Sequence, residues 1–556
     1  MGVRRPVRVN VVSVKRTPAP RQDVCIVGAG PAGALVAHRL ASVGHDVVVL
    51  EAGPRFDFED RPERMERSIR PGHEDLSVWG MGGERDEFST AGEQFYPLNT
   101  ARVKGVGGST LHWQGMVMRL HESDFAGRLP NDDPPWPISY EELRPYYAEV
   151  ESAFGVAGAS DNPFAPPRED PHPMPAFEPS YSDSLFAPAC ERLGITTHSV
   201  PNARNSEGYD DRSACVGYGT CQPVCPSGAK YSADNHIEKA EDEGARVIDR
   251  APVQRLATGD DGDRIESAVY ATPEGTEHRQ TAREFVLAAG GIEIPRLLLL
   301  SRSTQYPDGL ANTSGAVGRY FMEHLFAGAG GTIDQETRQN HVGFITSESH
   351  QFYDDPGQSL TRDGETILPA AAGPLSPIKL EFLNYAGPSP VEMALDAEEW
   401  GDALLSDIRS AYGNNIAMGG LVGQPPRREN RVTLDGATTD DHGNPVPEIH
   451  WSWGPRVRQT IARANEIQHA VLGELGTEIA WTAGPASTGP AYHHMGTTRM
   501  GTDPTESVVD PTLRTHDLAN CWIASSSVFP TAGSMNPTLT IGALALRCAD
   551  ELDERL

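Results

Sequence analysis

The sequence predicts an α/β fold, in which a Rossmann-like domain with a parallel sheet carries an inserted α+β domain with an antiparallel sheet. The stretch DVCIVGAGPAGALVAHRLASVGHDVVVLEAG is typical of a strand, a tight turn, a helix and a second strand. Apolar strands followed by small residues recur near residues 290 and 525, in EFVLAAGGIEIPRLLLL and CWIASSSVFP. Residues 335–480 contain further strand-like pieces, such as NRVTL and PEIHWSW. We therefore expect the first domain to be assembled from the start, the middle and the end of the chain.

The opening unit predicts a dinucleotide site. Gly28, Gly30 and Gly33 have the G-x-G-x-x-G spacing, directly between the strand at 24–27 and the helix that follows it. The first two glycines permit a tight turn and close approach to a pyrophosphate, and the third lets the helix pack against the strand. Glu51 ends the second strand, where it can accept hydrogen bonds from an adenosine ribose. This motif alone does not distinguish FAD from NAD.

Composition indicates a soluble, acidic globular chain. Its 556 residues include 77 acidic and 47 basic side chains, for a formal charge of −30. Only five of the basic residues are lysines: Lys15, Lys104, Lys230, Lys239 and Lys379. This imbalance favours adaptation to high salt over an ordinary acidic surface, because salt screens the self-repulsion. Nucleic acid is not expected as a partner, since its phosphates would be repelled.

Composition and apolar patterning also predict the tail, the absence of a membrane span and the domain boundaries. No apolar run approaches the roughly 20 residues of a membrane-spanning helix, and the N-terminus lacks the apolar core of a signal peptide. Residues 1–20 are expected to form a disordered basic tail. The first domain is expected to comprise 21–130, 210–334 and 481–556, with a cysteine-containing insert at 213–228. Residues 131–209 are expected to connect the domains on the substrate side, and 335–480 to form the substrate domain.

The stretch CVGYGTCQPVCPSG gathers Cys215, Cys221 and Cys225 within eleven residues. A disulfide would leave one cysteine over, and no other disulfide framework is visible. A structural zinc site would need a fourth ligand, which His236 could supply. Short cysteine spacings that close with Cys-Pro are also typical of iron–sulfur ligands, and three cysteines suit a cluster with three irons. The residues alone therefore leave zinc and iron–sulfur open.

Five motifs occur in a fixed order along the chain: GAGPAG, GVGGST, VGRYFMEH, HHMGTTRMG and a terminal Asn-Pro segment. Together they resemble the glucose-methanol-choline (GMC) oxidoreductases, over nearly the whole chain. The resemblance implies an FAD enzyme that acts on CH–OH donors. It also implies further cofactor contacts at Gly107, Gly108, Ser109, Thr110, His112, Val253, Ala289 and Ser525.

The same resemblance implies the catalytic pair. His493 occupies the general-base position of HHMGTTRMG, and Asn536 occupies the partner position in GSMNPTLT. A histidine can take a hydroxyl proton near neutral pH, and an amide can donate to the substrate oxygen. The neighbouring His494 is expected to point elsewhere. His324, in FMEH, is expected to be structural.

His112, followed by Trp113, lies where some members of the family attach the flavin covalently. The alternative is that His112 packs against the flavin ring without a bond. The sequence does not decide between the two.

The resemblance also bears on the cysteines, because the region 204–249 is similar to the flavoprotein subunits of sugar and gluconate dehydrogenases. In that group the three cysteines bind a [3Fe–4S] cluster, and Val216 stands where some members have a further cysteine. The implied function is an FAD-dependent dehydrogenase of a sugar, sugar acid or polyol. Its electrons would leave through the cluster to an external acceptor.

The resemblance implies partners as well, a small chaperone-like subunit and a cytochrome or quinone-linked acceptor. The chain itself is expected in the cytoplasm, or exported and held at a membrane only through a partner. Two alternatives remain. One is a flavin oxidase or choline-type dehydrogenase with a structural zinc or thiol site, and the other is a non-catalytic flavoprotein electron carrier.

Overall fold

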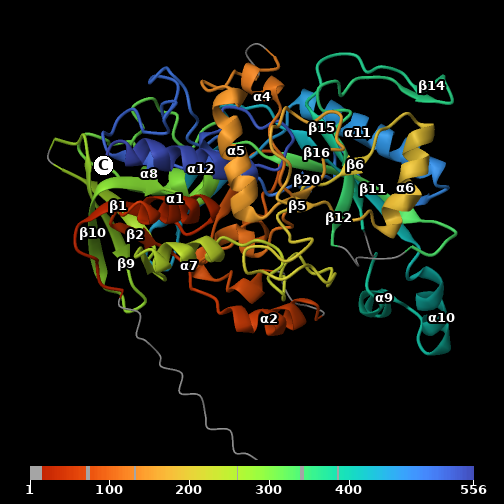
Figure 1. Ribbon diagram of the computed structural model, residues 1–556, viewed down its shortest axis with the longest axis horizontal. Helices are drawn as coiled ribbons and strands as arrows, with labels where there is room; N and C mark the ends of the chain where they lie inside the picture. The colour runs from red at the N-terminus through yellow and green to blue at the C-terminus, as the bar shows by residue number, and fades with distance from the viewer. Residues whose placement is uncertain (1–15, 71–75, 130–132, 260, 338–342, 385–386) are drawn as a thin grey trace, which may run out of the picture.

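The computed structural model describes residues 16–70, 76–129, 133–259, 261–337, 343–384 and 387–556 (Figure 1). The molecule has two halves, and each half is built around one seven-stranded sheet. The predicted fold class is confirmed: one sheet has a parallel core of the Rossmann type, and the other is antiparallel. The cavity described below lies between residues contributed by both sheets.

The first sheet begins with the predicted unit of β1 (Gln22–Val27), α1 (Pro31–Ser42) and β2 (Val47–Leu50). Its parallel core has the order β7-β2-β1-β10, and β21 pairs in parallel with β10. The other strands of the sheet are β7 (Arg246–Ile248), β8 (Val253–Thr258), β9 (Ile265–Ala271), β10 (Glu277–Leu287) and β21 (Cys521–Ile523). The apolar strands near residues 290 and 525 thus join the N-terminal strand in one sheet.

Helices cover the parallel strands. α1 starts with Pro31 at its first position, which suits the helix N-terminus, and packs against α7 (Asp234–Asp242) and α12 (Thr538–Asp553). α12 also packs on α5 (Tyr140–Phe154), which starts with a capping box between Ser139 and Glu142. α8 (Gly290–Leu300) follows β10 directly. These contacts enclose the largest cluster of buried apolar side chains.

The second sheet has the order β19-β11-β16-β15-β12-β6, and β20 pairs with β11. Its strands are β6 (His198–Ser199), β11 (His324–Thr332), β12 (Ile345–Ser349), β15 (Ile378–Leu383), β16 (Asn415–Gly423), β19 (Glu478–Ala483) and β20 (Gly489–Pro490). α11 (Pro455–Glu474) packs on β11 and β16, because its apolar side chains recur every three or four residues. α6 (Tyr181–Arg192) packs on β15 and α11.

Smaller elements complete the chain. The minor sheets are β17–β18–β3, of β17 (Arg431–Thr439), β18 (Pro445–His450) and β3 (Ser89–Ala91), and the pairs β13 (Leu360–Arg362) with β14 (Glu365–Leu368) and β4 (Ala157–Gly158) with β5 (Met174–Pro175). The short helices are α2 (Arg61–Ser68), α3 (Leu98–Ala101), α4 (Glu122–Ala126), α9 (Pro390–Asp396) and α10 (Asp402–Ala411). The 3₁₀ turns are η1 (Phe58–Asp60), η2 (Ser77–Trp79), η3 (Glu84–Asp86), η4 (Gly108–Leu111) and η5 (Ser526–Val528). α9 and α10 extend away from the body of the molecule (Figure 1).

The structure differs from two expected boundaries. The antiparallel sheet is not confined to 335–480, because β6, β11 and β20 lie outside that range and pair with strands inside it or with each other. Residues 16–20, expected in a disordered tail, are bound to the first domain instead. Arg16 forms an ion pair with Asp249 at 2.9 Å, and the Ala19 N–H donates to Gln280. Residues 1–15 lie outside the described part of the chain.

Candidate active site

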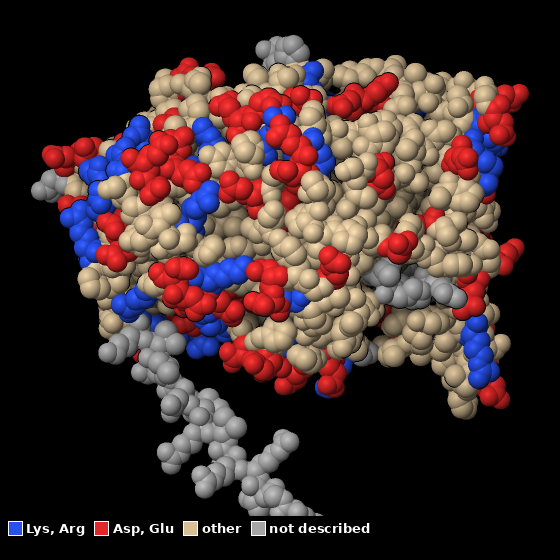
Figure 2. Space-filling view, viewed as in Figure 1, with Lys and Arg blue, Asp and Glu red and all other residues tan. Residues whose placement is uncertain are grey.

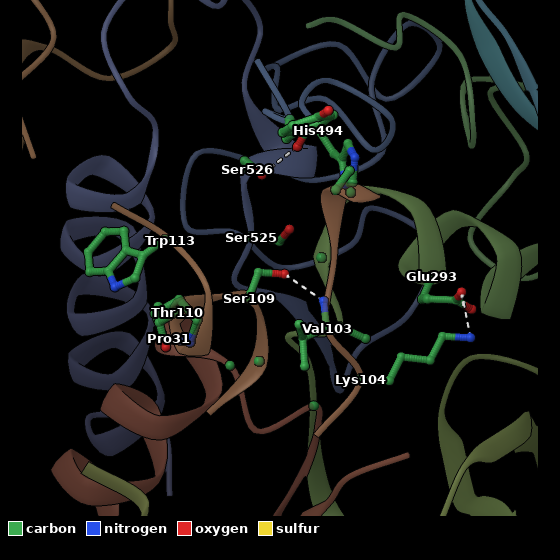
Figure 3. Close-up of a pocket in the computed structure, with 18 of the residues that line it drawn as sticks. Pro31, Val103, Lys104, Ser109, Thr110, Trp113, Glu293, His494, Ser525 and Ser526 are labelled. Carbon is green, nitrogen blue, oxygen red and sulfur yellow. Dashed lines mark hydrogen bonds and ion pairs between the residues drawn. The ribbon is translucent and has the colours of Figure 1, made fainter. Parts of the chain in front are cut away.

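A cavity of about 610 Å³ extends from the turn after β1 to the antiparallel sheet. It draws residues from segments far apart in the sequence, as Figure 3 shows for Pro31, Val103, Glu293 and His494. Both predicted catalytic residues and most of the predicted cofactor contacts line it. These are His493, Asn536, Gly28, Gly30, Glu51, Gly108, Ser109, Thr110, His112, Val253, Ala289 and Ser525. Gly33 and Gly107 do not line the cavity.

The glycine turn leaves room at the N-terminus of α1. Gly28 has φ +107, and a Cβ atom there would lie 2.7 Å from the Ala288 carbonyl oxygen. A Cβ at Gly33 would lie 2.0 Å from the Gly28 oxygen, so glycine is required for the helix to pack this closely. A Cβ at Gly30 would meet nothing within 4 Å. The open space lies at the positive end of a helix, as a pyrophosphate requires.

Glu51 lies at the end of β2, buried and facing the same cavity. Its carboxylate accepts hydrogen bonds from the backbone N–H groups of Ala29 (2.8 Å) and Gly53 (2.9 Å). Burial raises the pKa of Glu51 to about 7, and these two hydrogen bonds oppose the rise. The side chain is therefore fixed by the turn that it borders, with lone pairs left for a ligand hydroxyl.

The loop at 107–113 closes one side of the cavity. A Cβ at Gly108 would lie 2.8 Å from the Gly30 Cα, so the two glycine turns touch each other. The Ser109 hydroxyl accepts from the Val103 N–H at 3.2 Å (Figure 3). His112 is buried, and its Nδ1 has no hydrogen-bond partner among the described residues. Burial, with a contribution from Lys230, lowers the pKa of His112 to about 3, so its imidazole is neutral.

The structure brings His493 and Asn536 together. The His493 Nε2 lies 3.5 Å from the Asn536 Nδ2. The His493 Nδ1 lies 2.9 Å from the Nδ1 of His324, at the start of β11. Burial lowers the pKa of His493 well below its usual value, with further contributions from His324, Lys379 and His494. His493 is therefore neutral at physiological pH.

His324 determines which nitrogen of His493 carries the proton. The His324 Nε2 lies 3.1 Å from the Ala532 carbonyl oxygen, which can only accept, so this nitrogen carries hydrogen. In a neutral imidazole the His324 Nδ1 is then an acceptor, and burial lowers the pKa of His324 to about 4. The His493 Nδ1 must donate to it. The lone pair of the His493 Nε2 is thereby left beside Asn536, where a proton acceptor is needed.

His494 takes no part in this contact but also lines the cavity. Its ring packs edge-on against Tyr96 at 5.6 Å, and its carbonyl accepts from the Ser526 hydroxyl (Figure 3). Its Nε2 is buried and has no partner among the described residues. His494 was expected to point elsewhere, whereas the structure places it in the cavity wall, outside the contact between His493 and Asn536.

Sequence reasoning missed three charged side chains beside the pair. Lys379 and Glu381 lie on β15 and Glu348 on β12, all buried, and Glu381 lines the cavity. The Lys379 Nζ lies 2.8 Å from the Asn536 Oδ1. The signal in the sequence was IKLEFL, where two charges alternate with apolar residues inside a strand that is otherwise apolar.

The three clustered cysteines lie in a loop at the surface. Val216 and Tyr218, inside this loop, are 72% and 57% exposed, whereas Cys221 and Cys225 are buried. The thiols and His236 do not form a set of ligand atoms that all lie within 4.8 Å of one another, in the described residues. His236 faces Tyr231, with its Nδ1 3.0 Å from the phenol oxygen. A single zinc ion, which needs ligands within about 2.3 Å of itself, fits this arrangement poorly.

Buried cations surround the cysteine loop. Arg204 and Lys230 are 1% exposed and Arg212 is 9% exposed. None of the three forms an ion pair with a carboxylate in the described part of the chain, and the Nε atoms of both arginines lack partners. The Arg204 Nη1 lies 3.8 Å from the Cys221 Sγ. Buried charge without a counter-charge is costly. Here Arg204 lies over the Phe177 ring at 3.9 Å, and Arg212 donates to the Phe154 carbonyl at 2.8 Å.

Lys230 joins the wall of the cavity to the cysteine loop. Its Nζ donates to the carbonyl oxygens of Leu111 (3.1 Å), Trp113 (2.5 Å) and Cys221 (2.7 Å). Gln222, the residue after Cys221, lines the cavity and accepts from Gln114 at 3.0 Å. The loop around His112 and the cysteine loop are therefore held together by one buried ammonium group.

Comparisons with known proteins agree with this geometry. Two models described as "GMC oxidoreductase" match residues 65–326 and 426–545, and one described as "NAD(P)-binding Rossmann-like domain" matches 26–58. The chain is 33% identical to the fructose dehydrogenase large subunit of Gluconobacter japonicus, over 95% of this chain and 97% of that protein. It is 29% identical to the 2-methyl-1,2-propanediol dehydrogenase of Mycolicibacterium austroafricanum, over 97% and 96%.

A gluconate 2-dehydrogenase flavoprotein of Pantoea cypripedii is 25% identical, over 96% of this chain and 94% of its own length. Among solved structures, pyridoxine 4-oxidase from "Mesorbium loti" matches with a TM-score of 0.65 and 20% identity, over 96% of this chain and 99% of that chain. A variant of formate oxidase from Aspergillus oryzae matches with a TM-score of 0.67 and 16% identity, over 97% and 99%. At these identities the solved structures support the fold alone.

Proposed function

Because the chain belongs to the GMC oxidoreductase family and acts on CH–OH donors, we propose that it is an FAD-dependent dehydrogenase of a sugar, sugar acid or polyol. The observation that carries the proposal is the unprotonated His493 Nε2 facing the cavity beside the Asn536 amide. Such a pair can hold a substrate hydroxyl at one end of a nucleotide-binding cavity.

The residues present fit FAD. The open space at Gly30, the fixed carboxylate of Glu51 and the unpartnered Nδ1 of His112 all face one cavity. When bound, FAD supplies a hydride acceptor for the substrate carbon. His493 takes the hydroxyl proton at Nε2, and the Asn536 Nδ2 donates to the substrate oxygen as negative charge develops there. A covalent link from His112 to the flavin is proposed on the free Nδ1, and acid-precipitated protein that retained its yellow colour would support it.

We further propose that Cys215, Cys221 and Cys225 hold a [3Fe–4S] cluster. The buried cations Arg204, Arg212 and Lys230, which have no carboxylate partner in the described residues, support an anionic group in this loop. In those residues the three thiols do not all lie within 4.8 Å of one another, which favours a cluster with one cysteine per iron over one zinc ion. Such a cluster supplies one-electron transfer to an external acceptor. This favours a dehydrogenase over an oxidase that passes both electrons to oxygen.

The partners and the compartment are proposals of the same kind. One relative is named as a large subunit, which supports a complex with further subunits. We propose a small chaperone-like subunit and a cytochrome or quinone-linked acceptor as its other members. In the described residues no helix has both the length and the apolar character needed to cross a bilayer. Separately, we propose that the chain resides in the cytoplasm or is exported with a partner. Adaptation to salt is proposed from the net charge of −30, with activity retained in molar KCl as its check.

The variant His493→Ala tests the catalytic assignment. Removing the base is expected to lower kcat/KM by about 10² to 10⁴ fold in donor-dependent dye reduction, because proton transfer from the hydroxyl is lost. His469→Ala, a change on an exposed face of α11, is the matched control and should keep full activity. Bound FAD should remain at one per chain in both. Undiminished activity in His493→Ala would remove His493 as the base from the proposal. Unmodified protein that binds FAD but shows no donor-dependent dye reduction would favour a non-catalytic flavoprotein.

A further inference from the structure

One group of described residues has the geometry to attract a metal ion: His198, Glu348 and His350, whose ligand atoms lie within 4.8 Å of one another. Their lone pairs, however, are already used. The His198 Nε2 accepts from the His350 backbone N–H at 3.2 Å, and the His350 Nδ1 accepts from Asn162 at 2.9 Å. The donor there is the Asn162 Nδ2, because its Oδ1 accepts from a backbone N–H.

The His350 Nε2 therefore carries hydrogen and donates to the Glu348 Oε1 at 2.9 Å. The second oxygen of Glu348 lies 3.3 Å from the Lys379 Nζ. This second oxygen forms no hydrogen bond in the described residues, but the Lys379 ammonium group lies beside it as an ion-pair partner, where a cation would bind. These three residues are better explained as the start of a buried series of hydrogen bonds, which ends in the ion pair between Glu348 and Lys379.

The register of the sheet explains why Lys379 is there. Glu348 on β12 is directly opposite Glu381 on β15, and two carboxylates in this position repel each other. Lys379 is two residues from Glu381 on the same strand, so both side chains project from one face. Its Nζ lies 2.8 Å from Glu381 and 3.3 Å from Glu348, and all three side chains are at most 2% exposed. One ammonium group holds two carboxylates at a fixed point.

The third contact of that ammonium group is with the catalytic amide. The Lys379 Nζ lies 2.8 Å from the Asn536 Oδ1. An ammonium group can only donate, so it selects the amide orientation in which the oxygen faces Lys379. The Nδ2 is then directed toward the His493 Nε2, at 3.5 Å, and toward the cavity.

We propose that Lys379, anchored by Glu348 and Glu381, is the positioning residue that presents the Asn536 N–H to the substrate oxygen. With no donor at this position the amide is free to turn over, which would aim its oxygen at the developing negative charge. This inference rests on the proposed function, because it assumes that Asn536 contacts the substrate. It adds a residue from the antiparallel sheet to a catalytic pair carried by the C-terminal segment.

A double-mutant cycle on the holoenzyme tests it, with Lys379→Met, Asn536→Ala and the combination of the two. Each single variant is expected to lower kcat by about 10 to 100 fold with KM changed less than threefold. The combination should be no slower than Asn536→Ala alone, because Lys379 acts through that amide. Lys239→Met, which removes a partly exposed ion pair with Asp210, is the control and should leave kcat unchanged.

The outcomes separate the two claims. Undiminished kcat in Asn536→Ala would overturn the proposed role of that residue. Effects of Lys379→Met and Asn536→Ala that multiply in the combination would overturn only the positioning role. Because Lys379→Met leaves two buried carboxylates without a partner, the same cycle is run with Lys379→Met/Glu381→Gln, which keeps the net charge of the cluster. One FAD per chain and an unchanged melting temperature identify folded protein, and non-additive kcat values in either background support the proposal.

Discussion

At the scale of single residues, the site depends on nitrogen atoms whose protonation is fixed by their neighbours. The Ala532 carbonyl fixes His324, and His324 in turn fixes His493. Neither step needs a charged group, because burial keeps both imidazoles neutral. A base with its lone pair held toward the substrate loses nothing to tautomer exchange before proton transfer.

The pH dependence follows from the same burial. Burial first, and then His324, Lys379 and His494, lower the pKa of His493 below 6.5, so the unprotonated base persists as the pH falls through that value. We expect kcat/KM to stay constant from pH 7.5 down to below pH 6.5 and to decline only in more acidic buffer. Steady-state dye reduction at constant ionic strength measures this. A loss of kcat/KM with a midpoint at or above pH 6.5 would contradict this, because it would mean that His493 is exposed to solvent or that a nearby negative charge stabilises its protonated form.

The residues of the site could be predicted where a motif fixed them. Gly28, Gly30 and Glu51 face the cavity because a strand–turn–helix leaves few other positions for them. Lys379 could not be assigned, because its role depends on which strand lies beside β15, and pairing between strands 30 residues apart leaves no local signal. His324 was expected to be structural for the same reason: its contact with His493 joins residues 169 positions apart.

At the scale of elements, the two sheets contribute different chemistry to one cavity. The parallel sheet supplies turns and backbone N–H groups, whereas β15 and β16 supply Glu381 and Leu421. β16 contains Gly419 opposite Glu381, and a Cβ there would lie 2.6 Å from the Phe326 ring and 3.3 Å from the Glu381 carboxylate. The glycine therefore leaves the volume that the carboxylate and the aromatic ring occupy.

The Glu381 carboxylate is expected to influence which substrates the cavity accepts. With Glu348 and Lys379 ionised, Glu381 gives the cluster one negative charge in excess, next to the site of reaction. Two unit charges about 6 Å apart at an effective dielectric of about 20 interact by roughly 3 kcal/mol, enough to select against anions. We expect a neutral sugar or an amino sugar to be preferred over the matching sugar acid by at least about tenfold in kcat/KM.

The variant Glu381→Gln checks this, with glucose, glucosamine and glucuronic acid as a matched set in flavin reduction and in competition against the best donor. Loss of the carboxylate should reduce the preference over the acid by about tenfold, because the amide is similar in size but neutral. A sugar acid that matched the neutral sugar in the unmodified enzyme would contradict this account of the cavity.

The order of the elements was more predictable than their grouping. The β1–α1–β2 unit and the strands near 290 and 525 were predicted because each is apolar and bounded by glycine or serine. The domain boundaries were not, because β11 is separated from β19 by about 150 residues and pairs with it antiparallel. Period and composition mark the strands themselves, whereas the choice of partner is decided by packing.

At the scale of the whole molecule, the face in Figure 2 has several groups of acidic side chains, with basic side chains between them. Many of the arginines are paired at the surface, whereas Arg204, Arg212 and Lys230 are buried near the cysteine loop without carboxylates. Among the described residues these three cations have no carboxylate partner, and Lys230 donates instead to three backbone carbonyl oxygens. The loop that they surround reaches the cavity at Gln222, and Lys230 joins it to the Trp113 carbonyl in the cavity wall.

The central claim is that this chain couples a flavin to an iron–sulfur cluster. The most direct measurement is anaerobic titration of the purified holoenzyme with sugars, aldonic acids and polyols, followed together by visible absorbance, EPR and metal analysis. We predict about three iron atoms and one FAD per chain, and donor-dependent bleaching of the flavin absorbance. We also predict an EPR signal of the oxidised cluster that is lost on reduction and absent from Cys225→Ala. One zinc and no iron, with full donor-dependent bleaching, would contradict the account and leave an enzyme that keeps its electrons at the flavin.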